Sequence, residues 1–306
     1  MDNWKSEFAI RSIVAVMRLF GKLPLKFHYF WGDIMSWFMK SVLHYRRDVV
    51  IANIARSFPR MNYGEIKSVA SLFYRHLGEI FAEAVWFCGS DYRRIHESRI
   101  CRYTNFEVLR EAYESSPSVT VLYSHCGNWE LLGGLWCYNY DPETDYPGDE
   151  NIVKVIYRRL HSHVWNEVFK RNRSCPIKVE GGYEGQIETK HILRYAIKHR
   201  NEKFIYVYPT DQYPYSVSHD VGPFLNQKTN VMLGSAGLAH KLGMSVLYLR
   251  MKPVSRGHYE MTFVPVSRNA AEETPESIMR KYLDLLEADI RETPYNWLWS
   301  HKRWKF

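Results

Sequence analysis

The sequence predicts an α/β protein with a mostly parallel central sheet flanked by helices, preceded by a helical N-terminal segment. From about residue 118 onward, short runs of β-branched and aromatic residues alternate with helical stretches, which is typical of βαβ units. A long amphipathic pattern at 66–87 precedes this alternation. The 306 residues, 46% hydrophobic and 24% charged, are enough to bury a sizeable core and do not resemble the composition of a disordered chain.

The segment from Phe8 to Tyr45 is predicted to form two helices that lie in a membrane interface. Charged side chains interrupt every window of about 20 residues that could otherwise span a bilayer. Basic residues interleaved with large apolar and aromatic ones are typical of helices at the membrane surface, and Pro24 separates the two helical pieces. The alternative is an amphipathic pair docked on the protein's own core. The interrupting charges are Arg11, Arg18, Lys22, Lys26 and Asp33, and the apolar residues are Phe8, Ile10, Ile13, Val14, Met17, Phe20, Phe30, Trp31, Ile34, Trp37 and Phe38.

We therefore divide the chain into a membrane-associating segment at 1–45 and a second domain at 46–306. The second domain begins with two helices, and its strands and helices then alternate. The opening helices are expected at 46–57 and 66–87, the strands at 118–125, 152–158, 204–212, 245–251 and 259–266, the helices between them at 128–140, 162–173, 186–200 and 231–243, and a closing helix at 274–294. A polar insertion at 141–151 interrupts the alternation.

Composition limits the classes of function. The 41 Lys and Arg residues outnumber the 33 Asp and Glu residues, so the net charge of +8 suits an acidic protein, an anionic lipid or a nucleic acid as partner. The five cysteines form no CxxC pair, which argues against a disulfide framework or a zinc cluster and fits a reducing compartment. The first residues lack the pattern of a secretory signal peptide.

Polar side chains follow several of the predicted strands at the points where those strands end. His125 follows the first strand, Arg158 ends the second, and Asp211 with Gln212 follows the third. Ligands of open α/β sheets bind at the carboxyl ends of the strands, so these residues are candidates for one site.

The stretch "SHCGNWE" predicts a general base held by a carboxylate. On a regular helix His125 and Glu130 would be turned about 140° apart, so they can meet only if His125 stays in the loop and Glu130 enters the first helical turn. Gly127 permits the tight bend, and Asn128 is a favourable N-cap residue. An ionised Glu130 bonded to one imidazole nitrogen would leave the other nitrogen free as a base. A histidine that merely caps a helix is the alternative.

These residues resemble a known family. "SHCGNWE" is similar to the H-x4-(D/E) motif of the lysophospholipid acyltransferase superfamily, in the form found in the bacterial lipid A biosynthesis (late, or secondary) acyltransferases. The resemblance extends to "NIARSFPR" at 53–60, "VIYRRL" at 155–160, "YPTDQ" at 208–212, the segment 221–243 and the closing "WLWSHKRWK" at 297–305. Arg159 departs from the family's common proline, and Leu225-Asn226 stands where the family has Phe-Gly; Asn tolerates the left-handed backbone almost as Gly does.

The resemblance implies a glycerolipid-acyltransferase-like fold and a membrane-associated O-acyltransferase. The expected reaction moves a fatty acyl chain from an acyl thioester, acyl carrier protein or coenzyme A, to a hydroxyl of a lipid A precursor at the cytoplasmic face of the bacterial inner membrane. His125 would be the base, oriented by Glu130. The expected substrate-binding residues are Arg158, Asn128, Gly127, Asp211 and Gln212, with Arg158 gripping an acceptor phosphate or stabilising the oxyanion. No cofactor or metal is expected, since His161 and His163 lack a third ligand at a suitable spacing.

Three alternatives remain at the level of sequence. An enzyme of the same superfamily could act on an aminolipid, a phospholipid or a glycolipid. A basic nucleic-acid-binding protein would fit the charge and the aromatic residues, but no helix-turn-helix, RNP or zinc pattern is present. A hydrolase could use Cys126 or Ser124 as nucleophile, although neighbours on an extended chain point to opposite faces and are poorly placed for activation by His125.

Overall fold

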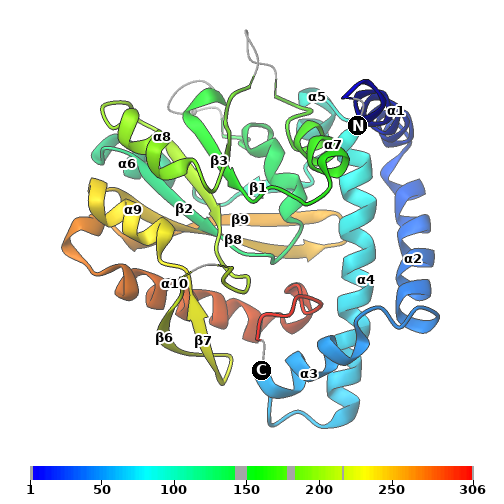
Figure 1. The fold of residues 1–306 in the computed structure, drawn as a ribbon. Helices are drawn as coiled ribbons and strands as arrows, with labels where there is room; N and C mark the ends of the chain where they lie inside the picture. The colour runs from blue at the N-terminus through cyan, green and yellow to red at the C-terminus, as the bar shows by residue number, and fades with distance from the viewer. Residues whose placement is uncertain (1–2, 142–149, 178–182, 216, 305–306) are drawn as a thin grey trace.

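The computed structural model describes residues 3–141, 150–177, 183–215 and 217–304. The predicted polar insertion at 141–151 lies mostly outside these residues. In the described part, helices dominate the first hundred residues, and strands alternate with helices after them (Figure 1).

The prediction of an α/β fold with a mostly parallel sheet is confirmed. Seven strands form one sheet in the order β1-β9-β8-β2-β5-β3-β4, and the only antiparallel pair within it, among described residues, is β8 with β9. The strands are β1 (Cys101–Tyr103), β2 (Val119–Tyr123), β3 (Val153–Tyr157), β4 (Gln186–Glu188), β5 (Ile205–Pro209), β8 (Ser245–Ser255) and β9 (His258–Ser267). The central position of β2, between β8 and β5, places the loop that begins at Ser124 at the middle of one sheet edge.

Alternate side chains of the central strands divide the core into two layers. Val119 and Val121 of β2 pack into one cluster, whereas Leu122 packs into the other. This is the period of two expected when both faces of a parallel sheet are covered. Helices α5 (Tyr92–Ser98) and α6 (Phe106–Ser115) and the end of α4 (Tyr63–Cys88) cover one face. Helices α8 (Ile192–Lys198), α9 (Gly234–Leu242) and α10 (Pro275–Glu292) and the C-terminal residues cover the other.

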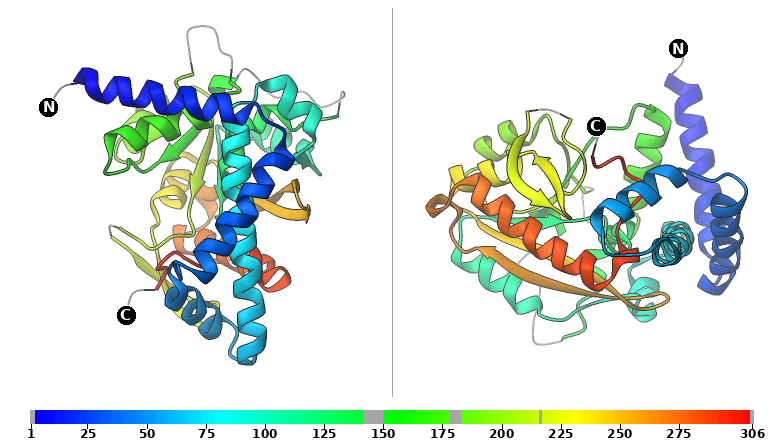
Figure 2. Two further views of the ribbon diagram at one scale, coloured as in Figure 1. Left: turned by 90° about the vertical axis from the view of Figure 1, so that its right-hand side faces the viewer. Right: turned by 90° about the horizontal axis from the view of Figure 1, so that it is seen from below.

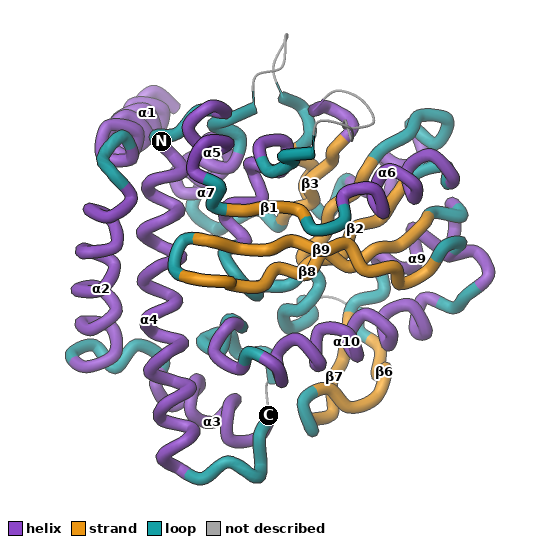
Figure 3. Tube along the Cα trace, turned by 180° about the vertical axis from the view of Figure 1, so that it is seen from behind, coloured by secondary structure: helices purple, strands orange, loops and turns teal. Residues whose placement is uncertain are grey.

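Most helices have the expected order and bounds, but α5 and α6, like the strand β1 between them, were not predicted. The helices are α1 (Asn3–Gly21), α2 (Leu25–Ser41), α3 (Arg47–Ser57), α4 (Tyr63–Cys88), α5 (Tyr92–Ser98), α6 (Phe106–Ser115), α7 (His163–Arg173), α8 (Ile192–Lys198), α9 (Gly234–Leu242) and α10 (Pro275–Glu292). The long helix α4 begins with a capping box formed by Asn62 and Glu65. It runs beside the sheet with α2 against its outer side, as Figures 1 and 3 show from opposite directions.

Three local predictions were wrong. The stretch at 128–140 forms a 3₁₀ helix, η1 (Trp129–Cys137), rather than an α-helix, and the stretch at 186–200 begins with the edge strand β4 before α8 starts. A hairpin of β6 (His219–Phe224) and β7 (Gln227–Val231) was not predicted. Its two-residue turn, Leu225-Asn226, has positive φ at both positions, which a type I′ turn requires, so Asn226 does preserve a left-handed turn where the family has glycine.

The N-terminal helices pack on α4 through closely approaching backbones. Pro24 directly precedes α2, as predicted, and a Cβ atom on Gly32 of α2 would lie 2.8 Å from the Gly78 carbonyl oxygen of α4. Gly21 at the end of α1 lies equally close to Gly89 after α4. Figure 2 shows α1 crossing the top of α4 and α2 lying along its side. The first two helices are thus fixed to the second domain by backbone contacts that only glycine permits.

The opposite faces of α1 and α2 are uncovered. In α1 the contacts with α4 and α7 bury Ile10 and Val14, whereas the large apolar residues on its other side remain exposed. Across the described residues, no helix combines the length and apolarity needed to cross a bilayer. The exposed apolar residues of the two helices are Trp4, Phe8, Val16, Leu19, Phe20, Phe27, Phe30, Trp31, Ile34, Trp37 and Phe38.

We predict that Gly32→Ala lowers the free energy of unfolding by about 1–3 kcal/mol, because the added methyl group overpacks the contact between α2 and α4. Denaturant unfolding followed by circular dichroism measures the change. Gly237→Ala in α9 is the control: its Cβ would meet no atom within 4 Å, so removing a helix-interior glycine there should stabilise the protein by up to about 1 kcal/mol. Equal behaviour of the two variants would contradict the packing argument.

Candidate active site

The candidate site lies at the carboxyl ends of β2 and β5. These strands pair in parallel with Tyr123 opposite Pro209, and the Thr210 N–H bonds to the Tyr123 carbonyl just beyond the last pair. The loops that leave the two strands therefore start side by side, and they bring His125 and Asp211 together from positions 86 residues apart.

His125 and Asp211 form a closely bonded pair. The imidazole Nδ1 lies 2.6 Å from Asp211 Oδ1, and the His125 backbone N–H donates to Asp211 Oδ2 at 2.8 Å. The Trp297 indole N–H donates to the same Oδ2, also at 2.8 Å. Burial alone would raise the pKa of Asp211, but His125 and these N–H donors outweigh it and lower the pKa to about 2. The ionised carboxylate has no proton to give, so Nδ1 carries the hydrogen and Nε2 presents its lone pair.

Two side chains surround the free nitrogen of His125. The Gln212 amide nitrogen lies 3.0 Å from His125 Nε2 and can donate to its lone pair. The Trp129 ring stands edge-on to the imidazole, with 4.8 Å between ring centroids. The side chain of His125 keeps 12% of its surface exposed, and Gln212 is exposed, so a substrate group can reach Nε2 by displacing the amide.

The turn after His125 is built by Gly127 and Asn128, as the sequence predicts. Gly127 adopts φ +64°, and the Asn128 side chain accepts from the Glu130 N–H at 3.1 Å, so Asn128 caps η1. The Gly127 N–H, a candidate oxyanion donor, is already bonded to Asn296 Oδ1 at 2.9 Å. The turn is therefore a rigid structural feature whose first amide is occupied.

A buried carboxylate holds this turn from below. Glu83 of α4, fully buried, accepts from Asn128 Nδ2 at 2.8 Å, from the Tyr29 hydroxyl at 2.7 Å and from the Tyr259 hydroxyl at 2.9 Å. Burial raises the pKa of Glu83, and the three donors oppose that shift. Tyr29 lies on α2, so one hydrogen-bond network links the N-terminal helices, α4, β9 and the turn beside His125.

Glu130 does not bond to His125, so that prediction is wrong. Glu130 instead accepts two bonds from Arg173 at the end of α7, at 2.7 and 3.0 Å. The physical reason is that η1 turns the carboxylate toward α7, where the planar guanidinium binds both oxygens. Burial would raise the pKa of Glu130, but Arg173 outweighs burial and lowers it. Asp211, expected only as a substrate-binding residue, is the carboxylate that contacts the imidazole.

Arg158 lies apart from this group. It follows β3, and its guanidinium stacks on the Tyr215 ring at 4.2 Å from the centroid. Within the part of the chain that the structure describes, Arg158 forms no ion pair with Glu130 or Asp211, whose partners are Arg173 and His125. The structure thus brings together His125, Asp211 and Gln212, with Gly127 and Asn128 beneath them.

The C-terminal residues complete the site, and residue reasoning missed their role. Trp297 bonds to Asp211, and Asn296 holds Gly127. His301 accepts from the Tyr213 N–H at 3.0 Å, and burial lowers the pKa of His301 to about 4, so it is neutral. The only signal for these contacts was the resemblance of the closing "WLWSHKRWK". Nothing in the local patterns pointed to Glu83 or Arg173.

A cavity of about 360 Å³ opens beside the site, between α2, α4, η1 and the C-terminal residues. Trp129 and His301 line its inner end, and Leu77 and Phe81 of α4 line its wall. It therefore reaches from the surroundings of His125 toward the exposed side of α4. Among the described residues, no cluster of His, Cys, Asp and Glu is arranged to hold a metal ion.

Comparison with known families gives one match over nearly the whole chain. A family model described as bacterial lipid A biosynthesis acyltransferase matches residues 5–306, which include the N-terminal helices, both halves of the site and the C-terminal residues. None of the curated proteins that were compared matches the chain.

The Glu130–Arg173 pair predicts a measurable dependence of stability on pH. A double-mutant cycle with Glu130→Gln and Arg173→Gln should give a coupling of about 1–2 kcal/mol at pH 7, a moderate value because the Arg173 side chain is 38% exposed. The folded-state pKa of Glu130 is lowered, so this coupling is present above its unfolded pKa and is lost as the pH falls below about 4. Denaturant unfolding at pH 7 and at a pH below about 4 measures the coupling. The exposed Arg93–Glu97 pair is the control, because its solvated charges interact weakly; a Glu130–Arg173 coupling no larger than the Arg93–Glu97 coupling would contradict the assignment.

Proposed function

The chain belongs to the bacterial lipid A biosynthesis acyltransferase family, and on that basis we propose that it transfers a fatty acyl chain from an acyl thioester to a hydroxyl of a lipid A precursor. The observation that carries this proposal is the His125–Asp211 pair at the ends of two adjacent parallel strands. Acyl carrier protein is the proposed donor, because a net charge of +8 favours an acidic partner. No cofactor takes part in this proposal.

In this mechanism His125 is the general base. The acceptor hydroxyl replaces the Gln212 amide at Nε2 and transfers its proton to that nitrogen as its oxygen attacks the thioester carbonyl. The tetrahedral intermediate then collapses: the new ester forms, the carbon–sulfur bond breaks, and the imidazolium returns the proton to the leaving thiolate. Asp211 holds the reactive tautomer and stabilises the imidazolium through the 2.6 Å contact.

Glu130 takes a supporting role in the proposed mechanism. Its carboxylate favours a positive charge on His125 from a distance, while Arg173 fixes its position. Trp129, between the two, limits the movement of the imidazole ring. Glu130 therefore acts through electrostatics and the placement of η1 rather than by orienting the ring directly.

The alternative of a covalent acyl-enzyme has little support. Cys126 is buried, and burial raises the pKa of its thiol well above the usual value. The Ser124 hydroxyl is buried and accepts from the Cys126 N–H at 3.3 Å. Neither side chain bonds to His125 in the described structure, so direct attack by the acceptor hydroxyl is the simpler path.

We assign the cavity beside Trp129 to the acyl chain and Arg158 to the acceptor. The cavity is lined mainly by apolar and aromatic side chains and reaches Trp129, whose ring lies 4.8 Å from the His125 imidazole, which suits a hydrocarbon chain whose thioester must reach His125. Arg158 lies at the end of a neighbouring strand and has no carboxylate partner among the described residues, so its planar guanidinium is free to grip a phosphate.

The uncovered faces of α1 and α2 are proposed to lie in the membrane interface at the cytoplasmic side of the inner membrane. Trp31 and Trp37 of α2 are 54% and 59% exposed, and Phe8 of α1 is 68% exposed. Aromatic side chains at this density, between basic residues, are typical of helices that insert one face among lipid head groups. The cavity beside α4 lies next to α2, so a lipid could pass from the interface to the site.

We predict that Asp211→Asn lowers kcat by about two to four orders of magnitude, as expected when a general base loses the group that fixes its tautomer. The acceptor KM should change little, since the lost interaction is made in the transition state. Glu130→Gln, the matched carboxylate control, should cost at least tenfold less in kcat. Steady-state kinetics with circular dichroism as a check on folding measures both. A larger loss of kcat for Glu130→Gln would indicate that Glu130, rather than Asp211, orients His125.

We also predict that replacing Trp31 and Trp37 by Glu abolishes sedimentation with anionic vesicles and leaves the circular-dichroism spectrum unchanged. Leu193→Glu on α8 is the control, because Leu193 is equally exposed, at 55%, on a helix that lies away from α1 and α2 (Figure 1). Undiminished vesicle binding by the double variant would indicate that another surface of the protein contacts the membrane.

A further inference from the structure

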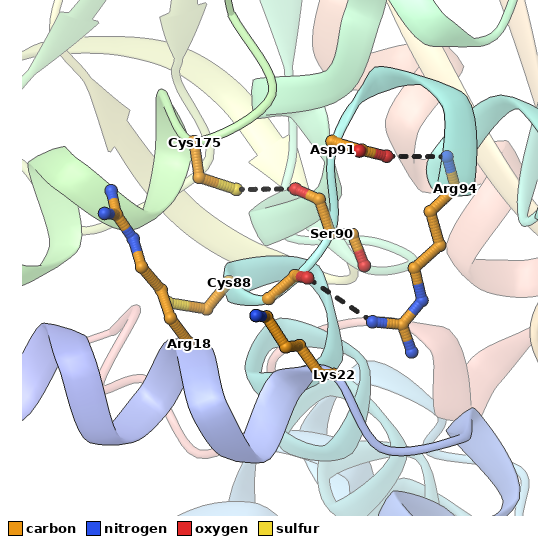
Figure 4. A pocket seen from close by; sticks show the side chains of 8 residues that line it. Arg18, Lys22, Cys88, Ser90, Asp91, Arg94 and Cys175 are labelled. Carbon is orange, nitrogen blue, oxygen red and sulfur yellow. Dashed lines mark hydrogen bonds between the residues drawn. The ribbon is translucent and has the colours of Figure 1, made fainter.

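A second cavity, of about 510 Å³, lies at the C-terminal end of α4, beyond the residues of α4 that line the acyl cavity. It is enclosed by the end of α1, the end of α4, the start of α5 and the residue Cys175 after α7. Figure 4 shows the side chains of Arg18 and Lys22 extending from the blue helix into this space, with Arg94 facing them from α5. Neither the proposed reaction nor the sequence patterns account for it.

The charges around this cavity are unbalanced. Three cationic side chains line it, Arg18, Lys22 and Arg94, against one carboxylate, Asp91. Asp91 already caps α5, since its Oδ1 accepts from the Arg94 N–H at 2.9 Å. Arg18 and Lys22 make no ion pair with any described residue, which leaves two cations facing the same space.

The walls of the cavity are held in place by backbone contacts. The Arg94 guanidinium donates to the carbonyls of Gly21 and Leu23, both at 2.7 Å, and so ties the end of α1 to α5. Gly21 and Gly89 approach so closely that neither could carry a Cβ atom without a backbone shift. The positions from which Arg18 and Lys22 extend are therefore fixed relative to the rest of the domain.

The residues around the cavity indicate which kind of anion could bind Arg18 and Lys22. Leu19, the residue after Arg18, is 67% exposed and belongs to the uncovered face of α1. An anion that reaches Arg18 and Lys22 from that side would carry an apolar group. The cavity volume of about 510 Å³ lies in the range of sites that take a small molecule or a head group.

We propose that this cavity binds the phosphate head group of an anionic phospholipid and fixes the orientation of the enzyme on the membrane. The proposal rests on the proposed placement of α1 and α2 in the interface. Lys22 and Arg18 would contact the phosphate oxygens while the acyl chains lie along Leu19. This lipid would be a structural ligand, distinct from the acceptor at His125.

The test uses a monomeric lipid, so that it requires neither a membrane nor catalysis. Binding of dihexanoyl phosphatidylglycerol below its micelle concentration is measured by calorimetry with the full chain. Lys22→Gln should weaken binding about fivefold, the loss expected for one cation near a lipid surface, and the Arg18→Gln/Lys22→Gln double variant should weaken it further. Lys26→Gln is the matched control: Lys26 is an exposed lysine four residues away and does not line the cavity, so its removal should leave binding unchanged.

Four outcomes would overturn the proposal. Dihexanoyl phosphatidylcholine binding as tightly as phosphatidylglycerol would mean that the cavity does not select an anionic head group. Inorganic phosphate binding as tightly would assign the cavity to a free anion. An equal loss in Lys26→Gln would indicate general surface charge. Loss of carrier-protein binding in Lys22→Gln with lipid binding intact would assign the cations to the donor protein. Because none of these measurements needs turnover, failure of the acyl-transfer proposal would leave the result interpretable.

Discussion

The contact between His125 and Asp211 depends on the parallel pairing of β2 with β5. Each residue follows its strand by one turn of loop, so the two can meet only because the strands are neighbours in the same direction and in this register. The pairing also explains the short distance: the His125 backbone N–H bonds to the same carboxylate, so loop and side chain are fixed together. A shift of one residue in register would separate them.

The rest of the protein can be understood as support for that contact. A fully ionised Asp211 in a buried position is costly unless donors surround it, and the C-terminal Trp297 supplies one of the three. Asn296 holds Gly127, and Glu83 holds Asn128, so both residues of the turn beside His125 are bonded to distant elements. The final residues of the described chain are thus as important to the geometry as the motif around His125.

Sequence reasoning predicted the sheet because strand periodicity is a local property. The alternation of apolar runs located β2, β3, β5, β8 and β9 within a few residues, and the polar residues at their ends identified His125 and Asp211. Local patterns do not show which strands are neighbours. They therefore predict a partner close to His125 in the sequence, Glu130. The partner of His125 in the structure, Asp211, lies 86 residues away. Glu130 instead binds Arg173, whose position depends on where α7 packs. Contacts set by packing between distant segments leave no local pattern.

Helix α4 connects the candidate site at the sheet edge with the surface proposed to contact the membrane. Its outer side carries α2, its C-terminal part supplies Glu83 to the turn beside His125, and its Leu77 and Phe81 line the cavity that reaches Trp129. The close backbone contact at Gly32 and Gly78 leaves α2 little freedom to move relative to this helix. The proposed membrane-binding face and the proposed base are consequently held at a fixed distance by one rigid element. A lipid that enters along α2 would therefore meet the cavity, and through it His125, without any rearrangement of the fold.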